Sequence, residues 1–237
     1  MSFKERRFNR GGRPRLSYVP LALLLLYLVA VRLTIARNPD MFRSAAQAAV
    51  FTWPMLGVVA AVGLGGTWVA RHTQRFPEMW DRRIALGWRL WLPIVFGLVL
   101  GVVAILVDRA THWTTLAAQQ MKLPSIHIEP PASYLIYPGG AIIVSILYFA
   151  LLVPLFTWIF RGRGFWLIAA IVALIEPCTQ DLNMTGGLAM TIAVFAEDYV
   201  LNLGQVFLFY RAGFVAAVLL RIVFYIVWHM VWPMLGG

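Results

Sequence analysis

Residues 212–234 read AGFVAAVLLRIVFYIVWHMVWPM, a long apolar stretch near the C-terminus. A helix needs about 20 apolar residues to cross the hydrocarbon core of a bilayer, and this stretch is long enough. Three polar side chains interrupt it, Arg221, Tyr225 and His229, each four residues after the one before. This spacing places them along one stripe of a helix, and an ionisable residue at such depth usually faces a protein interior or a wet cavity. The stretch therefore predicts a membrane-spanning helix with a polar face directed inward.

The composition extends this conclusion to the whole chain. Of the 237 residues, 61% are hydrophobic, and the mean hydropathy is +0.76. The apolar runs are continuous, whereas strands of a membrane barrel would alternate between apolar and polar residues. The single cysteine excludes an intramolecular disulfide and a cysteine-built metal site. The expected fold class is an all-α, polytopic transmembrane helix bundle.

The pattern of apolar runs predicts about seven spans. They cover residues 17–36, 45–70, 90–107, 133–160, 165–177, 186–210 and 212–234. The fifth run is short for a lone spanning helix, and whether it crosses the bilayer fully is left open. We divide the chain into a basic arm (1–16), N-terminal transmembrane helices and loops (17–132) and a C-terminal transmembrane core (133–237).

The net charge of +10 is distributed unevenly along the chain. Six basic residues precede the first span: Lys4, Arg6, Arg7, Arg10, Arg13 and Arg15. Arginines recur in the loop 71–89 and in the turn 161–163, whereas the intervening loops together carry no net charge. Because basic loops remain on the cytoplasmic side, we expect a multi-pass protein of a bacterial inner membrane with its N-terminus in the cytoplasm and its C-terminus outside. We expect the arm to contact anionic lipid, and no nucleic-acid partner.

Small and aromatic residues within the spans carry structural predictions. Gly97 and Gly101 form a small-xxx-small pair that allows close approach of another helix. Tryptophans near the span ends, among them Trp158, Trp228 and Trp232, are predicted to anchor the helices at the membrane interfaces.

Few ionisable residues lie within the predicted spans. They are Glu176, Glu197, Asp198, Arg221 and His229. Counted along their helices, Glu197, Asp198 and Arg221 lie near mid-membrane, whereas Glu176 and His229 lie toward the outer side. We expect Arg221 to pair with Glu197 or Asp198 and, together with Tyr225, to form a structural polar network.

The role of His229 has two interpretations that the sequence leaves open. In the first, Glu176 or Glu197 polarises a water, and His229 acts as acid, base or hydrogen-bond donor to an oxyanion. In the second, His229 is a hydrogen-bonded residue of the helix core. A metal site built from His229, Glu176 and Glu197 has no diagnostic spacing, so no metal ligand is predicted, and the sequence identifies no cofactor.

Residues 203–214, LGQVFLFYRAGF, and 221–229, RIVFYIVWH, lie on two successive predicted helices joined by a short turn. Upstream, residues 137–149 read YPGGAIIVSILYF. These stretches resemble motif regions of the CAAX protease and bacteriocin-processing (CPBP, or Abi) family of intramembrane proteases. The family's last motif is HxxxN or HxxxD, and here His229 matches the histidine while Pro233 follows at the last position.

The family's first motif, EExxxR, is replaced in this chain. Val144 and Ser145 stand where the resemblance places the paired glutamates, and Phe149 stands where it places the arginine. The resemblance implies a protease-like core over residues 133–233 that lacks the glutamates thought to activate water. The expected function is therefore a catalytically impaired, membrane-embedded binding or assembly subunit.

The expected partners of such a subunit are the lipid bilayer and other membrane proteins or a hydrophobic peptide. The alternative is an active CPBP-type intramembrane endopeptidase that uses Glu176 or Glu197 with His229, so enzymatic activity is left undecided. A transporter fits less well, because the sequence has no internal repeat.

Overall fold

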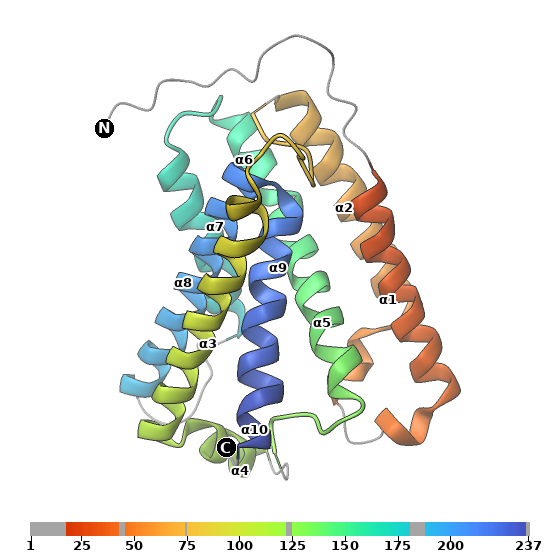
Figure 1. The fold of residues 1–237 in the computed structure, drawn as a ribbon, viewed down its shortest axis with the longest axis vertical. Helices are drawn as coiled ribbons and strands as arrows, with labels where there is room; N and C mark the ends of the chain where they lie inside the picture. Colours follow the sequence, from red (N-terminus) through yellow and green to blue (C-terminus); the bar gives the residue numbers. More distant parts are fainter. Residues whose placement is uncertain (1–17, 43–45, 74, 122–124, 181–187, 236–237) are drawn as a thin grey trace.

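The computed structural model describes residues 18–42, 46–73, 75–121, 125–180 and 188–235, and within these ranges the chain is helical and contains no strand. Most helices run along the long axis of the molecule, and a short helix lies across one end (Figure 1). The prediction of an all-α transmembrane bundle is confirmed.

The helices are of three kinds. The α-helices that run along the bundle are α1 (Val19–Arg37), α2 (Trp53–Thr73), α3 (Leu92–Thr111), α5 (Ser133–Val144), α6 (Leu152–Ile159), α7 (Phe165–Gln180), α8 (Leu188–Ala212) and α9 (Phe214–Tyr225). The described residues also form α4 (Trp113–Met121), α10 (Trp232–Met234) and the 3₁₀ segments Pro39–Phe42 and Ala46–Val50. Within the described ranges, the π-helical segments are η3 (Gly87–Trp91), η4 (Ser145–Ala150) and η6 (Ile226–Val231), and each directly adjoins an α-helix.

Six helical stretches of the described chain are long and apolar enough to cross a membrane. They are Val19–Arg37, Trp53–Thr73, Gly87–Thr111, Ser133–Ile159, Thr191–Ala212 and Phe214–Met234. Helix α7 is a further apolar helix that is too short to be counted with them. The chain is thus a multi-pass integral membrane protein, and the described residues of each predicted apolar segment are mainly helical. The fifth is longer than predicted, because α7 continues through Pro177 to Gln180.

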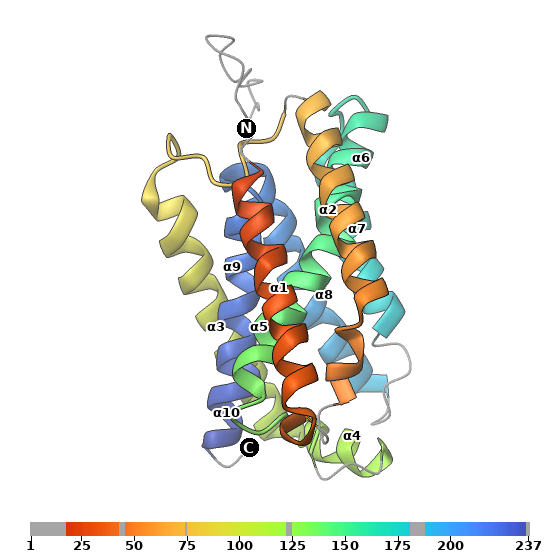
Figure 2. The ribbon, with the colours of Figure 1, turned by 90° about the vertical axis from the view of Figure 1, so that its right-hand side faces the viewer.

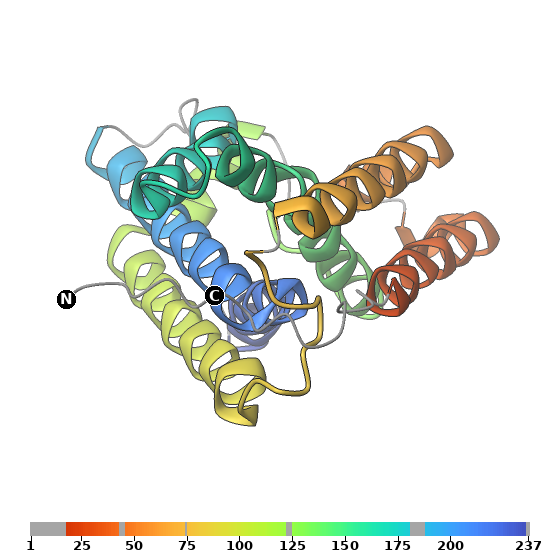
Figure 3. The same cartoon turned by 90° about the horizontal axis from the view of Figure 1, so that it is seen from above.

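Helix α9 occupies the centre of the bundle and packs against α3, α5 and α8. Helix α7 in turn packs against α8. Viewed from above, α1 and α2 lie at one edge, beyond α5 (Figure 3), and Figure 2 shows this edge from the side. Helix α9 therefore packs on elements from both halves of the sequence, and its Arg221 faces other helices rather than lipid.

The close approach of α3 to α9 depends on glycine, as predicted for the small-xxx-small pair. An added Cβ on Gly97 would lie 2.7 Å from the carbonyl oxygen of Leu220. An added Cβ on Gly101 would lie 2.6 Å from the Cβ of Val227. Because both distances are shorter than atoms tolerate, only glycine allows this helix spacing at the two positions.

The tryptophans divide into two groups. Trp158 and Trp166 are more than half exposed, as expected for interfacial anchors. The prediction is wrong for Trp228 and Trp232, which are only 4% and 8% exposed. Trp228 stacks on Trp113 of α4, and Trp232 donates its indole N–H to the Asp108 carboxylate. Helix α4 covers this end of the bundle, so aromatic residues near the end of the last span are packed inside.

Basic side chains gather at one end of the bundle. This end holds the C-terminus of α2, the turn between α6 and α7, and the turn between α8 and α9, all at the top of Figure 1. Its arginines include Arg71, Arg75, Arg161, Arg163 and Arg211. The opposite end carries α4 and the C-terminus. The basic loops that are separated in the sequence thus lie together at one end of the folded chain.

Candidate functional site

The polar stripe of the last span centres on Arg221, whose side chain is only 1% exposed. Its guanidinium binds the carboxylate of Glu176 through two parallel hydrogen bonds, Nη1 to Oε1 at 2.6 Å and Nη2 to Oε2 at 2.5 Å. Glu176 is itself only 2% exposed. A bidentate, charge-assisted pair of this kind is among the strongest polar contacts in proteins. It ties α7 to α9 inside the bundle.

Helix α8 supplies the next two partners of Arg221. The Nε–H donates to Oε1 of Gln205 at 2.8 Å, and Nη2 also donates to Oδ1 of Asn202. Nη1 makes a further hydrogen bond to the hydroxyl of Tyr225 at 3.2 Å. A guanidinium has five N–H groups, and all five are now used. Arg221 therefore has no donor left for a ligand.

The side-chain amides of Asn202 and Gln205 on α8 make further hydrogen bonds that orient them toward Arg221. Pro177 has no N–H, so the carbonyl of Ala173, four residues earlier, lacks its usual helical partner. Asn202 donates its Nδ2–H to this carbonyl at 3.1 Å, which directs its oxygen at Arg221. The proline thus creates the acceptor that orients Asn202.

Gln205 is oriented in a similar way. Its Nε2 donates to the hydroxyl of Ser145 at 3.0 Å and to the carbonyl of Ala217 at 3.1 Å. Ser145 is the first residue of the π-helical segment η4, and such segments are frequent at functional sites. We call the set Ser145, Glu176, Asn202, Gln205, Arg221 and Tyr225 the Arg221 network.

The partner of Arg221 differs from the one we expected. Asp198 is close enough to interact electrostatically with Arg221 and Tyr225, but Glu176 makes the bidentate pair. The reason is that α7 continues past Pro177, so Glu176 lies inside the helix rather than at its end. Glu197 precedes Asp198 on α8 and is half-buried.

His229 lies in a second group of side chains, in the π-helical segment η6. The ring of Tyr137 stacks on it with centroids 4.3 Å apart and planes at 9°. Nδ1 of His127 lies 3.4 Å from Nδ1 of His229, and Tyr225 meets the ring edge-on with centroids 5.0 Å apart. Among the described residues, no carboxylate contacts His229. We call His127, Tyr137, Trp228 and His229 the histidine cluster.

Tyr137 holds the loop that carries His127. Its hydroxyl accepts a hydrogen bond from the backbone N–H of Ile128 at 2.7 Å while its ring covers His229. His127 is 8% exposed, and its Nε2 has no hydrogen-bond partner among the described residues. Tyr225 belongs to the Arg221 network and also contacts His229, so it connects the two groups.

Asp108 closes the same end of the bundle. It is 3% exposed and accepts hydrogen bonds from the backbone N–H of Thr114 at 3.0 Å and from Nε1 of Trp232 at 2.8 Å. It therefore joins the ends of α3, α4 and α10. A buried carboxylate that is fully hydrogen-bonded in this way is a structural element rather than a free base.

Burial controls the protonation of His127. Loss of solvent lowers the pKa of His127 from 6.5 to about 4, and the Asp108 carboxylate opposes this change only in part. The neighbouring ring of His229 is a second titratable group facing it. His127 is therefore neutral at pH 7 in the folded protein.

We expect the folded protein to lose stability in acid through His127. The pKa of this group is lower in the folded chain than its unfolded value of 6.5, so the stabilisation is complete above pH 6.5 and is lost as pH falls toward 4. The difference in pKa corresponds to about 3 kcal/mol. In His127→Phe, the melting temperature should fall less between pH 7 and pH 4.5 than it does in the wild type. His112→Asn, at an exposed histidine, should show the same fall in melting temperature as the wild type. Parallel slopes for His127→Phe and wild type would show that His127 does not titrate as described.

The structure brings some of the sequence-predicted site residues together and separates others. Glu176, Arg221 and Tyr225 are joined directly, while Glu176 and His229 have different partners. Within the described ranges, no three His, Cys, Asp or Glu side chains are grouped closely enough to hold a metal ion.

Several members of the two groups were not singled out from the sequence. Asn202 and Gln205 are three residues apart on one face of a predicted span, and amides in that setting often hydrogen-bond across helices. These two amides could therefore have been identified from the sequence. For His127 no local signal exists, because its contact with His229 joins residues 102 positions apart.

Comparison with protein-family models found no match, and comparisons with curated proteins and with solved structures found none either. Function is therefore inferred from the Arg221 network and the histidine cluster themselves.

Proposed function

We propose that this protein is a membrane-embedded binding or assembly subunit that does not hydrolyse peptide bonds. The observation that carries the proposal is the pairing of Glu176. Both oxygens of its carboxylate accept hydrogen bonds from Arg221, and the pair is almost completely buried. A general base must be within hydrogen-bond reach of the water that it activates. Both oxygens of Glu176 are instead bound by the guanidinium of Arg221, whose N–H groups are all used.

The surroundings of His229 support the same proposal. Its ring faces Tyr137, Tyr225 and His127, which are neutral groups or a second imidazole. Hydrolysis by the expected mechanism needs a carboxylate that shares a water with this histidine. A side chain stacked at 4.3 Å on Tyr137 is better suited to packing two helices together.

We further propose that the helical scaffold is related to that of the CPBP intramembrane proteases. This proposal rests on residues 137–149, 203–214 and 221–229, with Val144 and Ser145 in place of the paired glutamates. In this view, Ser145 has gained a structural role, because it accepts a hydrogen bond from Gln205 in the Arg221 network. The partners would be other membrane proteins or a hydrophobic peptide.

We also propose that the N-terminus is cytoplasmic and the C-terminus lies outside, in a bacterial inner membrane. The gathering of arginines at one end of the bundle supports this orientation.

The proposal is tested with the purified protein in phosphatidylcholine vesicles and with its complexes extracted in mild detergent. We expect no cleavage of a quenched fluorescent set of apolar peptides above the level of the Glu176→Gln variant. Native mass spectrometry of the extract should show the chain with a second protein at fixed stoichiometry. Cleavage that is lost in both Glu176→Gln and His229→Gln, with unchanged melting temperatures, would establish the peptidase instead. A chain that carries only lipid would contradict the role of an assembly subunit.

A further inference from the structure

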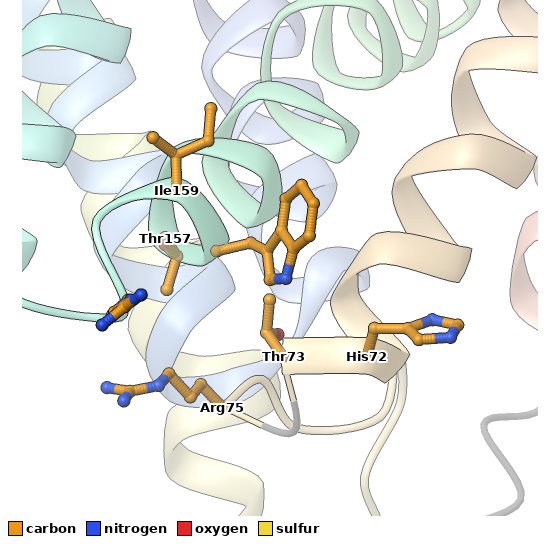
Figure 4. Close-up of a pocket in the computed structure, with 7 residues that line it drawn as sticks. His72, Thr73, Arg75, Thr157 and Ile159 are labelled. Atoms are coloured by element: carbon orange, nitrogen blue, oxygen red, sulfur yellow. The ribbon is translucent and has the colours of Figure 1, made fainter.

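A cavity of about 470 Å³ lies at the basic end of the bundle, apart from both polar groups described above. It is formed between the end of α2 and the end of α6 (Figure 4). Arg75 and Arg161 contribute its charge, Thr73 and Thr157 line it, and Trp158 forms an apolar wall. None of the described residues that line it is acidic.

The two arginines are available to a ligand. Among the described residues, neither guanidinium makes a hydrogen bond or an ion pair within the chain. This differs from Arg83, which binds Asp81 at 2.8 Å, and from Arg221, which uses all its donors. Two unpaired guanidinium groups on one cavity attract an anion, and their planar donors suit the oxygens of a phosphate.

The turn after α6 fixes the shape of the cavity. Arg161 has a φ of 52° and Gly162 a φ of 72°, both in the left-handed region. The N–H of Gly162 donates to the carbonyl of Thr157 at 2.7 Å, which closes the helix end. The guanidinium of Arg75 lies directly against Gly162, where an added Cβ would overlap it. In Figure 4 Arg75 extends along this side of the cavity, and His72 lies on the opposite side.

The apolar wall indicates which phosphate compound fits. Trp158 is 58% exposed and Ile159 54% exposed, so the cavity borders an uncovered apolar surface at the end of a membrane span. A soluble phosphate would bind the arginines but would leave the apolar side chains of Trp158 and Ile159 exposed. A phospholipid satisfies both requirements, since its headgroup is anionic and its acyl chains are apolar. Basic pockets between transmembrane helices are a known setting for anionic headgroups.

We propose that this cavity binds the headgroup phosphate of an anionic phospholipid, with Arg75 and Arg161 as its cationic ligands. The site is distinct from the basic arm at residues 1–16, whose attraction to anionic lipid needs no cavity. It also does not depend on the proposed function of the Arg221 network.

The test uses the full-length protein reconstituted into vesicles of phosphatidylcholine and phosphatidylglycerol at about three to one, so that an anionic headgroup is present. After extraction, native mass spectrometry counts the phosphatidylglycerol molecules retained by each chain. We expect the wild type to retain phosphatidylglycerol, and Arg75→Gln and Arg161→Gln each to weaken retention by about tenfold. Arg163→Gln is the matched control, because Arg163 is exposed on the same turn and does not line the cavity.

The outcomes separate a built site from general charge attraction. Equal losses in Arg163→Gln and Arg161→Gln would overturn the proposal, because only the overall charge would then matter. Binding of inorganic phosphate to the cavity arginines, without retained phosphatidylglycerol, would assign the cavity to a soluble phosphate compound and also overturn it. If Arg75→Gln fails to fold because of its packing on Gly162, the exposed Arg161 carries the comparison alone.

Discussion

Replacing Arg221 by methionine is expected to lower the free energy of unfolding by about 3–5 kcal/mol, measured by titration of the protein from mild detergent into SDS. The substitution leaves the buried carboxylate of Glu176 without its cation. It also removes the donors for Asn202 and Gln205, which lie in a fully buried part of α8. Breaking a buried ion pair from one side is costly because the remaining charge stays uncompensated in a medium of low polarity.

Arg109→Met provides the matched control for this substitution. Arg109 lies in the last turn of α3 and is exposed, so its loss should change stability by less than about 1 kcal/mol. A similar effect at both positions would mean that the pair with Glu176 contributes little. A small effect at Arg221 would also remove the main support for a structural role of the network.

Gly66→Val is expected to destabilise the protein by about 3 kcal/mol, for a reason unrelated to charge. Gly66 of α2 packs on the backbone of η4, and an added Cβ would overlap the carbonyl of Ala150. This carbonyl has an unusual environment, because Pro154, four residues later, has no N–H to donate to it. A larger side chain must push α2 away from η4 at this point, since the obstacle is backbone and cannot rotate aside.

Gly65→Val tests whether the effect comes from this contact. Gly65 is the neighbour of Gly66 on α2, and an added Cβ there meets no other atom within 4 Å. The change in helix propensity is the same at both positions, so we expect Gly65→Val to stay within about 1 kcal/mol of wild type. Equal destabilisation of the two variants in the same SDS titration would place the cause in α2 itself rather than in its packing.

The bundle was predictable from the sequence because its cause is local. A run of about 20 apolar residues forms a helix in a bilayer whatever its neighbours are, since the backbone must satisfy its own hydrogen bonds there. Gly97 and Gly101 were predictable as packing positions for a similar reason. Such a pair can be recognised from one helix alone, because it requires only small side chains on one face of that helix.

The site was predictable only in part, since partner choice depends on how helices rotate and extend. The stripe of Arg221, Tyr225 and His229 does face inward. The pairing of Arg221 with Glu176 depends on the continuation of α7 through Pro177, which the usual rule for proline does not predict. The burial of Trp228 depends on Trp113 of α4, which stacks on it, and Trp232 is held by the Asp108 carboxylate of α3.

The measurement that tests the central claim most directly is a pair of double-mutant cycles that share Glu176→Gln. One cycle combines it with Arg221→Met and the other with His229→Gln, and both use the free energy of unfolding in SDS. We expect a coupling of about 2–3 kcal/mol between Glu176 and Arg221, and less than about 0.5 kcal/mol between Glu176 and His229. A larger coupling to His229 than to Arg221 would contradict the assignment of Glu176 to the Arg221 network and would return it to the candidates for catalysis.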